Sequence, residues 1–382
     1  MARNSKSDWH APIYLSGVMY RGPVGKKFFL SQEGQNLEKE TLLGARAGAG
    51  KLQNLEFVTA AEYFQHRLNA SSNMMYFAGT FELGLADAHV VPEGRLGYGI
   101  GSAGKPLVAA TKDNLAFRTA PGVISIDIDA KSADEVAAIH PEGGSVIFET
   151  PQQVLDALFD VLPEAKGHPV LVMPSSSSLI ERKSDGKVMK GPGGWRILLL
   201  TRDASQTPRI LNTVHTRCWA HGINNFAFID KGGSFQKRSM ADLALARPTQ
   251  PDYPTSTLGE GLRKVPDTHL IKYEDAPLFD PDVVDVSIED RWGASENLKK
   301  VRGILKPEEV RQKAVVVERA VGRLVENGVP KPDAQRAVSM KLDRSILLGA
   351  DEVHFAGGDT VSVADLLSSA GESYDSKVCL DP

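Results

Sequence analysis

Val123-Ile124-Ser125-Ile126-Asp127-Ile128-Asp129 is an apolar, β-branched run, which predicts a buried strand. Successive side chains of a strand alternate between its faces, so Asp127 and Asp129 are expected to project from one face. Two like charges that close are costly unless a cation neutralises them, and Mg²⁺ or Mn²⁺ prefers oxygen ligands. The stretch therefore predicts a divalent-metal site, whereas the bare Asp-x-Asp tripeptide is also typical of a strand-end turn.

The composition is that of an ordinary soluble protein. The chain has 382 residues, of which 42% are hydrophobic and 24% charged, and this length predicts two or three domains. The first residues lack an apolar signal core and no later stretch has a membrane-spanning pattern, so we expect a cytoplasmic protein with no membrane partner. Cys218 and Cys379 lie far apart in sequence, which argues against a disulfide framework and a zinc site.

Charge is unevenly distributed along the chain. The net charge is −4, but residues 299–344 hold 12 basic and 6 acidic side chains, a local charge of +6 that leaves −10 for the remainder. Such an excess of one sign is either a solvated face or a surface for nucleic-acid phosphates.

Local signals predict several further elements. Thr59 to Glu62 is a capping box that opens a helix, and Pro151 stands in the first turn of another. The sequence also predicts a short helix that opens at 132–136 and an amphipathic helix at 203–218. Strands are predicted at 169–173 and 226–229, and a hairpin at 181–190 with its turn at Asp185-Gly186.

The glycine-rich segment 94–105 nominally contains dinucleotide-binding and phosphate-loop patterns. Pro106 argues against both, because a phosphate loop needs a Ser or Thr at that position and a helix beyond it. We therefore expect a loop without nucleotide contacts, followed by an extended segment at 107–109.

Three other features carry chemistry. Arg196 enters an apolar strand behind a run of glycines, and such an arginine needs an anion. A serine run, 175–178, follows the strand at 169–173. Asp242 is a third carboxylate, near Arg238, and taken alone it is more typical of a helix or turn cap.

From about Glu289 onward the sequence pattern changes to one that is typical of helices. Residues 307–327 predict a helix with Pro307 in its first turn and Gly328 beyond its end, and residues 332–348 predict a second helix. The short connection between them predicts antiparallel neighbours in a small helical domain.

In sequence order, Asp127-x-Asp129, Gly193-Gly194-x-Arg196 and Arg238-Ser239-x-x-Asp242 resemble the motifs of the archaeo-eukaryotic primase superfamily, in its plasmid and phage primases and primase-polymerases. The resemblance runs from about Thr111 to the last residue, and the first hundred residues are similar only loosely. Near the end, 358–367 resembles the join that leads into a helicase-type region in such proteins.

The resemblance implies an α+β fold. A primase catalytic domain would occupy residues 1–285, with an α/β N-terminal module and an RRM-like sheet that carries the carboxylates. A helical accessory domain, 286–382, would lead toward a possible helicase region or partner.

It also implies site residues. Asp127, Asp129 and Asp242 would be catalytic and would hold Mg²⁺ or Mn²⁺. The nucleotide-binding residues would be Arg196, Arg238, Ser175, Ser176, Ser177 and Lys190. Two departures stand out: family members usually have His at the place of Arg196 and Arg at the place of Gln250. Arg196 retains a permanent cation with several donors suited to phosphate.

Three functions compete. We expect template-directed primer synthesis on single-stranded DNA from NTPs, dNTPs or both, by a DNA primase or primase-polymerase of a mobile element. The second is a replication initiator that binds single-stranded DNA, with catalysis weakened by Arg196 and Gln250. The third is a metal-dependent phosphohydrolase that uses the same carboxylates.

Overall fold

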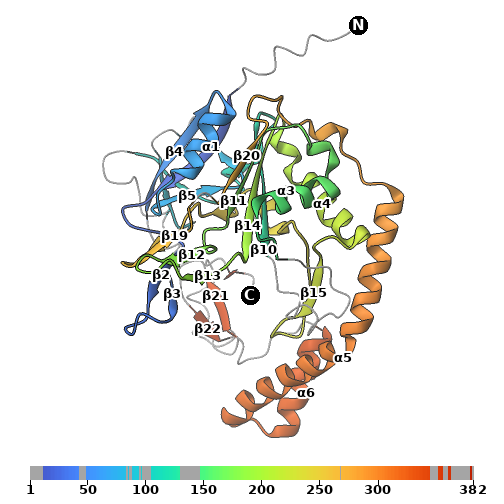
Figure 1. Ribbon diagram of the computed structural model, residues 1–382. Coiled ribbons are helices and arrows are strands. Elements are labelled where there is room, and N and C mark those ends of the chain that lie inside the picture. The colour runs from blue at the N-terminus through green and yellow to red at the C-terminus, as the bar shows by residue number, and fades with distance from the viewer. Residues whose placement is uncertain are drawn as a thin grey trace. The chain divides into compact units, whose positions relative to one another are not determined.

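The computed structural model describes residues 12–42, 49–82, 85, 88–93, 96, 105–129, 147–266, 268–344, 352–355, 360–362 and 379–380. The described residues form a mixed α+β fold with several sheets and with helices toward the C-terminal end (Figure 1). The chain divides into two compact units, the first made of Met1–Pro92, Tyr98–Ala227 and Lys237–Val301, the second of Glu93–Gly97, Phe228–Gln236 and Arg302–Pro382. None of the described helices is long and apolar enough to cross a membrane.

The centre of the first unit is a four-stranded antiparallel sheet. Its strands lie in the order β10 (Gly122–Asp129), β14 (Gly194–Thr201), β11 (Val170–Pro174) and β20 (Leu270–Lys272). The strand predicted around Asp127 is therefore confirmed. Every residue of β14 is buried, as expected for a central strand rich in leucine and isoleucine.

One face of this sheet is covered by two helices. Ile124, Ile126 and Ile128 are fully buried against α3 (Pro151–Val161) and α4 (Thr207–His221), on the same side of the sheet in Figure 1. Thr150 forms a capping box with Gln153, and α4 ends at Gly222 in the left-handed conformation, with φ of 68°. Because strand side chains alternate, the residues between the isoleucines, including Asp127, belong to the opposite face.

The opposite face packs against the N-terminal part of the chain (Figure 1). Leu198 and Leu200 of β14 join one core with residues of β1 (Ile13–Met19) and α1 (Ala60–Leu68). The capping box predicted at Thr59 is confirmed, since Thr59 accepts from the Glu62 N–H and Glu62 accepts from the Thr59 N–H. The N-terminal sheet has the order β17 (Pro251–Asp252), β5 (Met74–Phe77), β1, β4 (Gly50–Phe57), β7 (His89–Val91) and β8 (Leu107–Ala109).

Small sheets complete the first unit. The predicted hairpin is confirmed as β12 (Ile180–Arg182) and β13 (Val188–Lys190), with β19 (Leu262–Lys264) on the other side of β12. The other small sheets of this unit are β18 (Thr257–Leu258), β2 (Lys26–Leu30) and β3 (Leu37–Thr41), and the pair β6 (Thr80–Phe81) and β9 (Leu115–Ala116). β15 (Phe226–Ile229) and β16 (Phe235–Arg238) form a further pair, in which the segment Phe228–Gln236 belongs to the second unit.

The C-terminal helices differ from expectation at one end. α5 runs from Ile288 to Glu326, so the prediction that Pro307 lies in its first turn is wrong. A proline removes a single N–H from the helix ladder, and the segment before it is anchored by buried Ala294, Val301 and Leu305. The predicted end is confirmed, because Gly328 has a φ of 89°.

α6 (Lys331–Arg344) follows after a short connection, and Ala334 and Val338 pack with Val321 of α5. The predicted second helix is confirmed over these residues, and its last positions, 345–348, lie outside the described part. The short helix predicted at 132–136 lies outside it too, as do most of the glycine-rich segment 94–105 and most of 358–367. The extended segment predicted after Pro106 is confirmed as β8.

Candidate active site

Asp127 lies on the sheet face that is turned away from α3 and α4. Its partner in the β10–β14 register is Arg196, and the Arg196 Nη2 atom is 3.3 Å from Asp127 Oδ1. The Asp127 side chain is 24% exposed, so it is open to small ligands, whereas the Arg196 side chain is buried. Asp129 pairs with Gly194 at the end of the same ladder, and only its backbone is described.

Asp242 is brought to the same strand by a backbone contact. Its N–H donates to the Asp127 carbonyl oxygen over 3.2 Å, although the two residues lie more than a hundred positions apart. Asp242 also caps the 3₁₀ helix Leu243–Ala246, where its Oδ1 atom accepts from the Ala244 N–H at 3.0 Å. Arg238 lies 3.7 Å from that oxygen and is largely exposed. The side chain therefore has the cap role that is typical of an isolated Asp, and its backbone adjoins Asp127.

A buried histidine holds the turn that leads to Asp242, and sequence reasoning missed it. His215 of α4 has its Nδ1 atom 2.9 Å from the Ser239 hydroxyl oxygen, and that oxygen accepts from the Ala241 N–H. Burial, with a smaller effect of the nearby Lys237, lowers the pKa of His215 to about 4. The imidazole is therefore neutral at pH 7, and nothing in the sequence around it distinguished it from an ordinary helix residue.

Arg196 belongs to a buried chain of charges. Its guanidinium bonds Asp252 and Asp127, while Arg67 Nη2 donates to the other Asp252 oxygen at 2.7 Å. Burial raises the pKa of Asp252, but Arg196 and Arg67 outweigh it and hold that pKa below its usual value. Sequence reasoning missed Arg67 and Asp252, which come from α1 and β17 and carry no motif.

The predicted serine run adjoins the end of β10 through Gly194. The Ser175 N–H donates to the Gly194 carbonyl at 3.0 Å, and Ser175 and Ser178 share a hydroxyl bond of 2.9 Å. A Cβ atom on Gly194 would lie 2.8 Å from Ser175 Oγ, so only glycine permits this close approach of the serine loop. Ser176 and Ser177 are partly exposed in this loop.

Lys190 lies on β13, with its Nζ atom 5.2 Å from the centroid of the Phe28 ring. The structure thus brings together Asp127, Arg196 and Asp242 with its neighbour Arg238, and places the serines at the Gly194 edge of the sheet. Lys190 is positioned by a different, smaller sheet.

The donor chemistry of the site fits a hard divalent cation. Asp127 and Asp242 offer partly exposed carboxylates, which are the ligands that Mg²⁺ and Mn²⁺ prefer. Among the described residues no three His, Cys, Asp or Glu side chains gather as a metal site. Since the Asp129 side chain is not described, the predicted set of three carboxylates remains a prediction.

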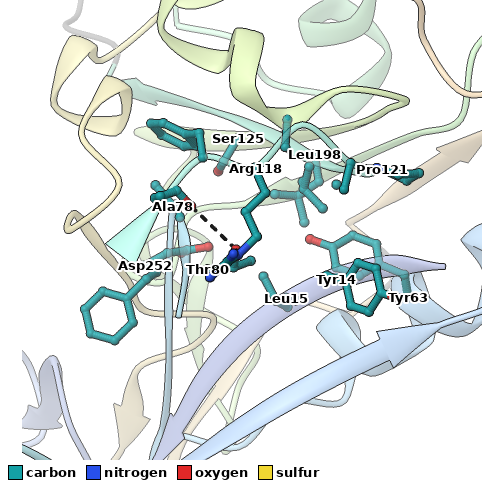
Figure 2. Close-up of a pocket in the computed structure, with 18 of the residues that line it drawn as sticks. Tyr14, Leu15, Tyr63, Ala78, Thr80, Arg118, Pro121, Ser125, Leu198 and Asp252 are labelled. Atoms are coloured by element: carbon teal, nitrogen blue, oxygen red, sulfur yellow. Dashed lines mark hydrogen bonds between the residues drawn. The ribbon is translucent and has the colours of Figure 1, made fainter. Parts of the chain in front are cut away.

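A narrow pocket flanks the charged chain. Figure 2 shows Ser125 and Leu198 of the central sheet across from Tyr14 and Leu15 of β1. Ser125 is two residues from Asp127, and its buried hydroxyl has no hydrogen-bond partner among the described residues. The space open to the centres of water-sized molecules is about 30 Å³, which suits a few ordered waters and excludes a nucleotide.

Comparison with known proteins identified no relative: no family model, no curated protein and no solved structure matches this chain.

Proposed function

We propose that this chain is a DNA primase or primase-polymerase that carries out template-directed primer synthesis. The observation that carries the proposal is the contact between the Asp242 N–H and the Asp127 carbonyl, with Arg196 paired to Asp127 on the other side. Asp127, the buried Arg196 and the backbone of Asp242, from three distant segments, thus adjoin one another at the edge strand β10, an arrangement that supports a role in nucleotidyl transfer.

The topology supports the finer fold proposal. Along the chain the main elements are β10, α3, β11, β14 and α4, with the β12–β13 hairpin between β11 and β14. The strands lie as β10-β14-β11, and both helices cover one face. This order supports the proposal of a split β-α-β arrangement, on which an RRM-like sheet is built. The fourth strand of that arrangement would lie beside β10, whereas β20 pairs with β11.

The residues have separate roles in the proposed reaction. Asp127, Asp129 and Asp242 would hold Mg²⁺ or Mn²⁺, which when bound stabilises the negative charge that develops on the phosphoryl oxygens. Arg196, Arg238, Lys190 and the serines 175–177 would bind the phosphates of an NTP or dNTP. Because Arg196 is buried between Asp252 and Asp127, it is positioned before any nucleotide arrives.

The basic helices would contact the template. We place the catalytic domain at residues 1–285 and the accessory domain at 286–382, the second of which contains the positive excess of 299–344. Phosphate contacts supply most sequence-independent affinity for single-stranded DNA. A helicase-type region or partner would act beside this domain.

Primer synthesis on single-stranded DNA, with Mg²⁺ or Mn²⁺ and with NTPs and dNTPs compared, tests the proposal. We expect Asp127→Asn and Asp242→Asn to abolish incorporation and to leave DNA affinity within about twofold, because neither residue holds the template. Asp156→Asn is the control, since Asp156 is exposed on α3 away from the site. Wild-type synthesis in the Asp127 variant would remove the metal assignment.

The buried ion pairs of Arg196 favour a second candidate. A guanidinium that already bonds two carboxylates has fewer donors left for a nucleotide, which suits a replication initiator with weak catalysis. If the wild-type protein binds single-stranded DNA tightly but forms no dinucleotide with either metal, the initiator is the better assignment. Hydrolysis of phosphate esters without template would instead indicate a phosphohydrolase.

A further inference from the structure

A second pocket lies beside the serine loop, within the first unit. Its polar lining comes from Arg67, Ser175, Ser176, Thr255, Lys264, Thr268 and the exposed His269. Among the described residues that line it there is no Asp or Glu. The space open to the centres of water-sized molecules is about 170 Å³, which accommodates a phosphate or pyrophosphate group.

Lys264 is the main cation of this pocket. Its Nζ atom donates to the carbonyl oxygens of Ser176 and Ser178, at 2.8 and 2.5 Å, and lies 3.3 Å from that of Ser175. Burial, with help from Lys190, lowers the pKa of Lys264 to about 7. The ammonium is mostly buried among neutral carbonyls, with no carboxylate paired to it among the described residues, so an anion in the pocket would stabilise its charge.

Arg67 also lines this space, and Lys190 lies near Lys264. Lys190 and Lys264 both pair with Ile180 in the β13-β12-β19 sheet, one on each side, so their positive charges add. Arg67 is 2% exposed; its Nη2 atom bonds Asp252, and its Nε–H is buried with no partner among the described residues. A buried donor without a partner is costly, and an oxyanion would satisfy it.

We propose that this pocket binds a phosphate group, whose oxygens accept from the Ser176 and Thr255 hydroxyls and from Arg67, while Lys264 supplies the counter-charge. The pocket shares Ser175 and Ser176 with the proposed nucleotide site, and Arg67, Thr255, Lys264 and Thr268 are additional to it. The inference rests on the pocket itself and goes beyond primer synthesis. The phosphate comes from a free anion or from the end of a nucleotide.

Calorimetric titration of the full chain with pyrophosphate, without metal or template, tests the site. We expect Lys264→Met to weaken binding at least about tenfold, which corresponds to about 1.4 kcal/mol. The matched control is Lys187→Met, an exposed lysine before β13 that does not line the pocket. Because Lys264 carries its charge only below its pKa, the ratio of wild-type to variant affinity should shrink as the pH rises above about 7.

The other charged or ionisable side chains that line the pocket or act on Lys264 are Lys190, Arg67 and His269. His269→Gln removes the imidazole and so separates its contribution from that of Lys264. The pH dependence of the Lys264→Met ratio should persist in the His269→Gln background. Its disappearance there would overturn the role of Lys264.

Lys264→Met leaves three carbonyls of the serine loop without their donor, so it could weaken binding by changing the loop structure. A second variant therefore tests the pocket with the loop intact. The double variant Ser176→Ala, Thr255→Val keeps every Lys264 bond and removes two hydroxyls from the pocket. We expect it to weaken pyrophosphate binding about three- to tenfold with an unchanged unfolding midpoint. No binding by the wild type, or wild-type affinity in both variants, would overturn the proposal.

The same titrations identify the source of the phosphate and separate this site from the proposed function. If ATP binds tighter than pyrophosphate, and Lys264→Met removes that advantage, the pocket takes the terminal phosphates of a nucleotide. If pyrophosphate binds as tightly as ATP, it takes the free anion. Asp127→Asn should retain pyrophosphate binding, so a protein that binds pyrophosphate but makes no primer contradicts the proposed function alone.

Discussion

At the scale of single residues, Arg196 shows that a buried charge requires partners of opposite charge. The sequence predicts that an arginine in an apolar strand needs an anion, and the structure supplies two, Asp127 beside it and Asp252 from β17. Asp127 was expected, because it lies in a motif. Asp252 and its second partner Arg67 could not be predicted, because the pairing depends on how the N-terminal sheet packs on the central one.

Asp252→Asn tests this chain of charges. Removing the carboxylate leaves Arg67 with no ionic partner among the described residues and Arg196 with Asp127 alone, in a buried setting where such losses cost about 3–5 kcal/mol. Urea unfolding should therefore show a midpoint well below that of the wild type. Asp156→Asn, on exposed α3 surface, should leave the midpoint unchanged. Equal midpoints for the two variants would contradict a structural role for the ion pairs of Asp252 with Arg67 and Arg196.

His215 predicts how stability depends on pH. Its pKa is lowered to about 4 in the fold, so between about pH 6.5 and 4 the unfolded chain binds a proton that the native protein does not. Stability from this group is thus complete above pH 6.5 and falls by about 3 kcal/mol toward pH 4. The difference in unfolding free energy between wild type and His215→Gln should shrink over that range. A difference that stays constant would show that His215 is not neutral and buried.

At the scale of elements, prediction succeeded where the signal is local. The capping box at Thr59, the helix start at Pro151, the hairpin turn and the β-branched strand are set by neighbouring residues, and all are present. Pro307 misled because a proline is tolerated within a long helix when the residues before it are anchored by packing. Strand order and register depend on contacts across the chain, which a single sequence does not reveal.

Gly194 links strand register to the serine loop. In Gly194→Ala the new methyl group would lie 2.8 Å from Ser175 Oγ and 3.2 Å from the Ile128 carbonyl oxygen, so the loop has to move. We expect a loss of about 1–3 kcal/mol in unfolding free energy and a raised KM for nucleotide. Gly193→Ala is the control, since a Cβ there meets nothing within 4 Å. Equal KM values in the two variants would show that the serine loop does not take part in nucleotide binding.

At the scale of the whole molecule, the candidate site is assembled from segments far apart in sequence. β10, β14 and the Asp242 turn supply the predicted residues, while α1 and β17 supply the unpredicted arginine and carboxylate. The site residues that were predicted are of types that are unusual in their local sequence, such as a charged residue within an apolar strand. The residues that were not predicted, together with Lys264 and His215, have no unusual sequence context, and their roles arise only from burial.

The uneven charge of the chain gives the last prediction. Arg319, Arg323 and Arg336 are exposed on α5 and α6, and if each contacts a template phosphate, the triple change to Gln lowers the slope of log affinity against log salt by about 2. Binding to single-stranded DNA at several salt concentrations measures this slope. Primer initiation should weaken as well, while extension of a preformed primer persists. Lys187→Gln, in the first unit, should leave the slope unchanged. A triple variant with the wild-type slope would show that these helices do not hold the template.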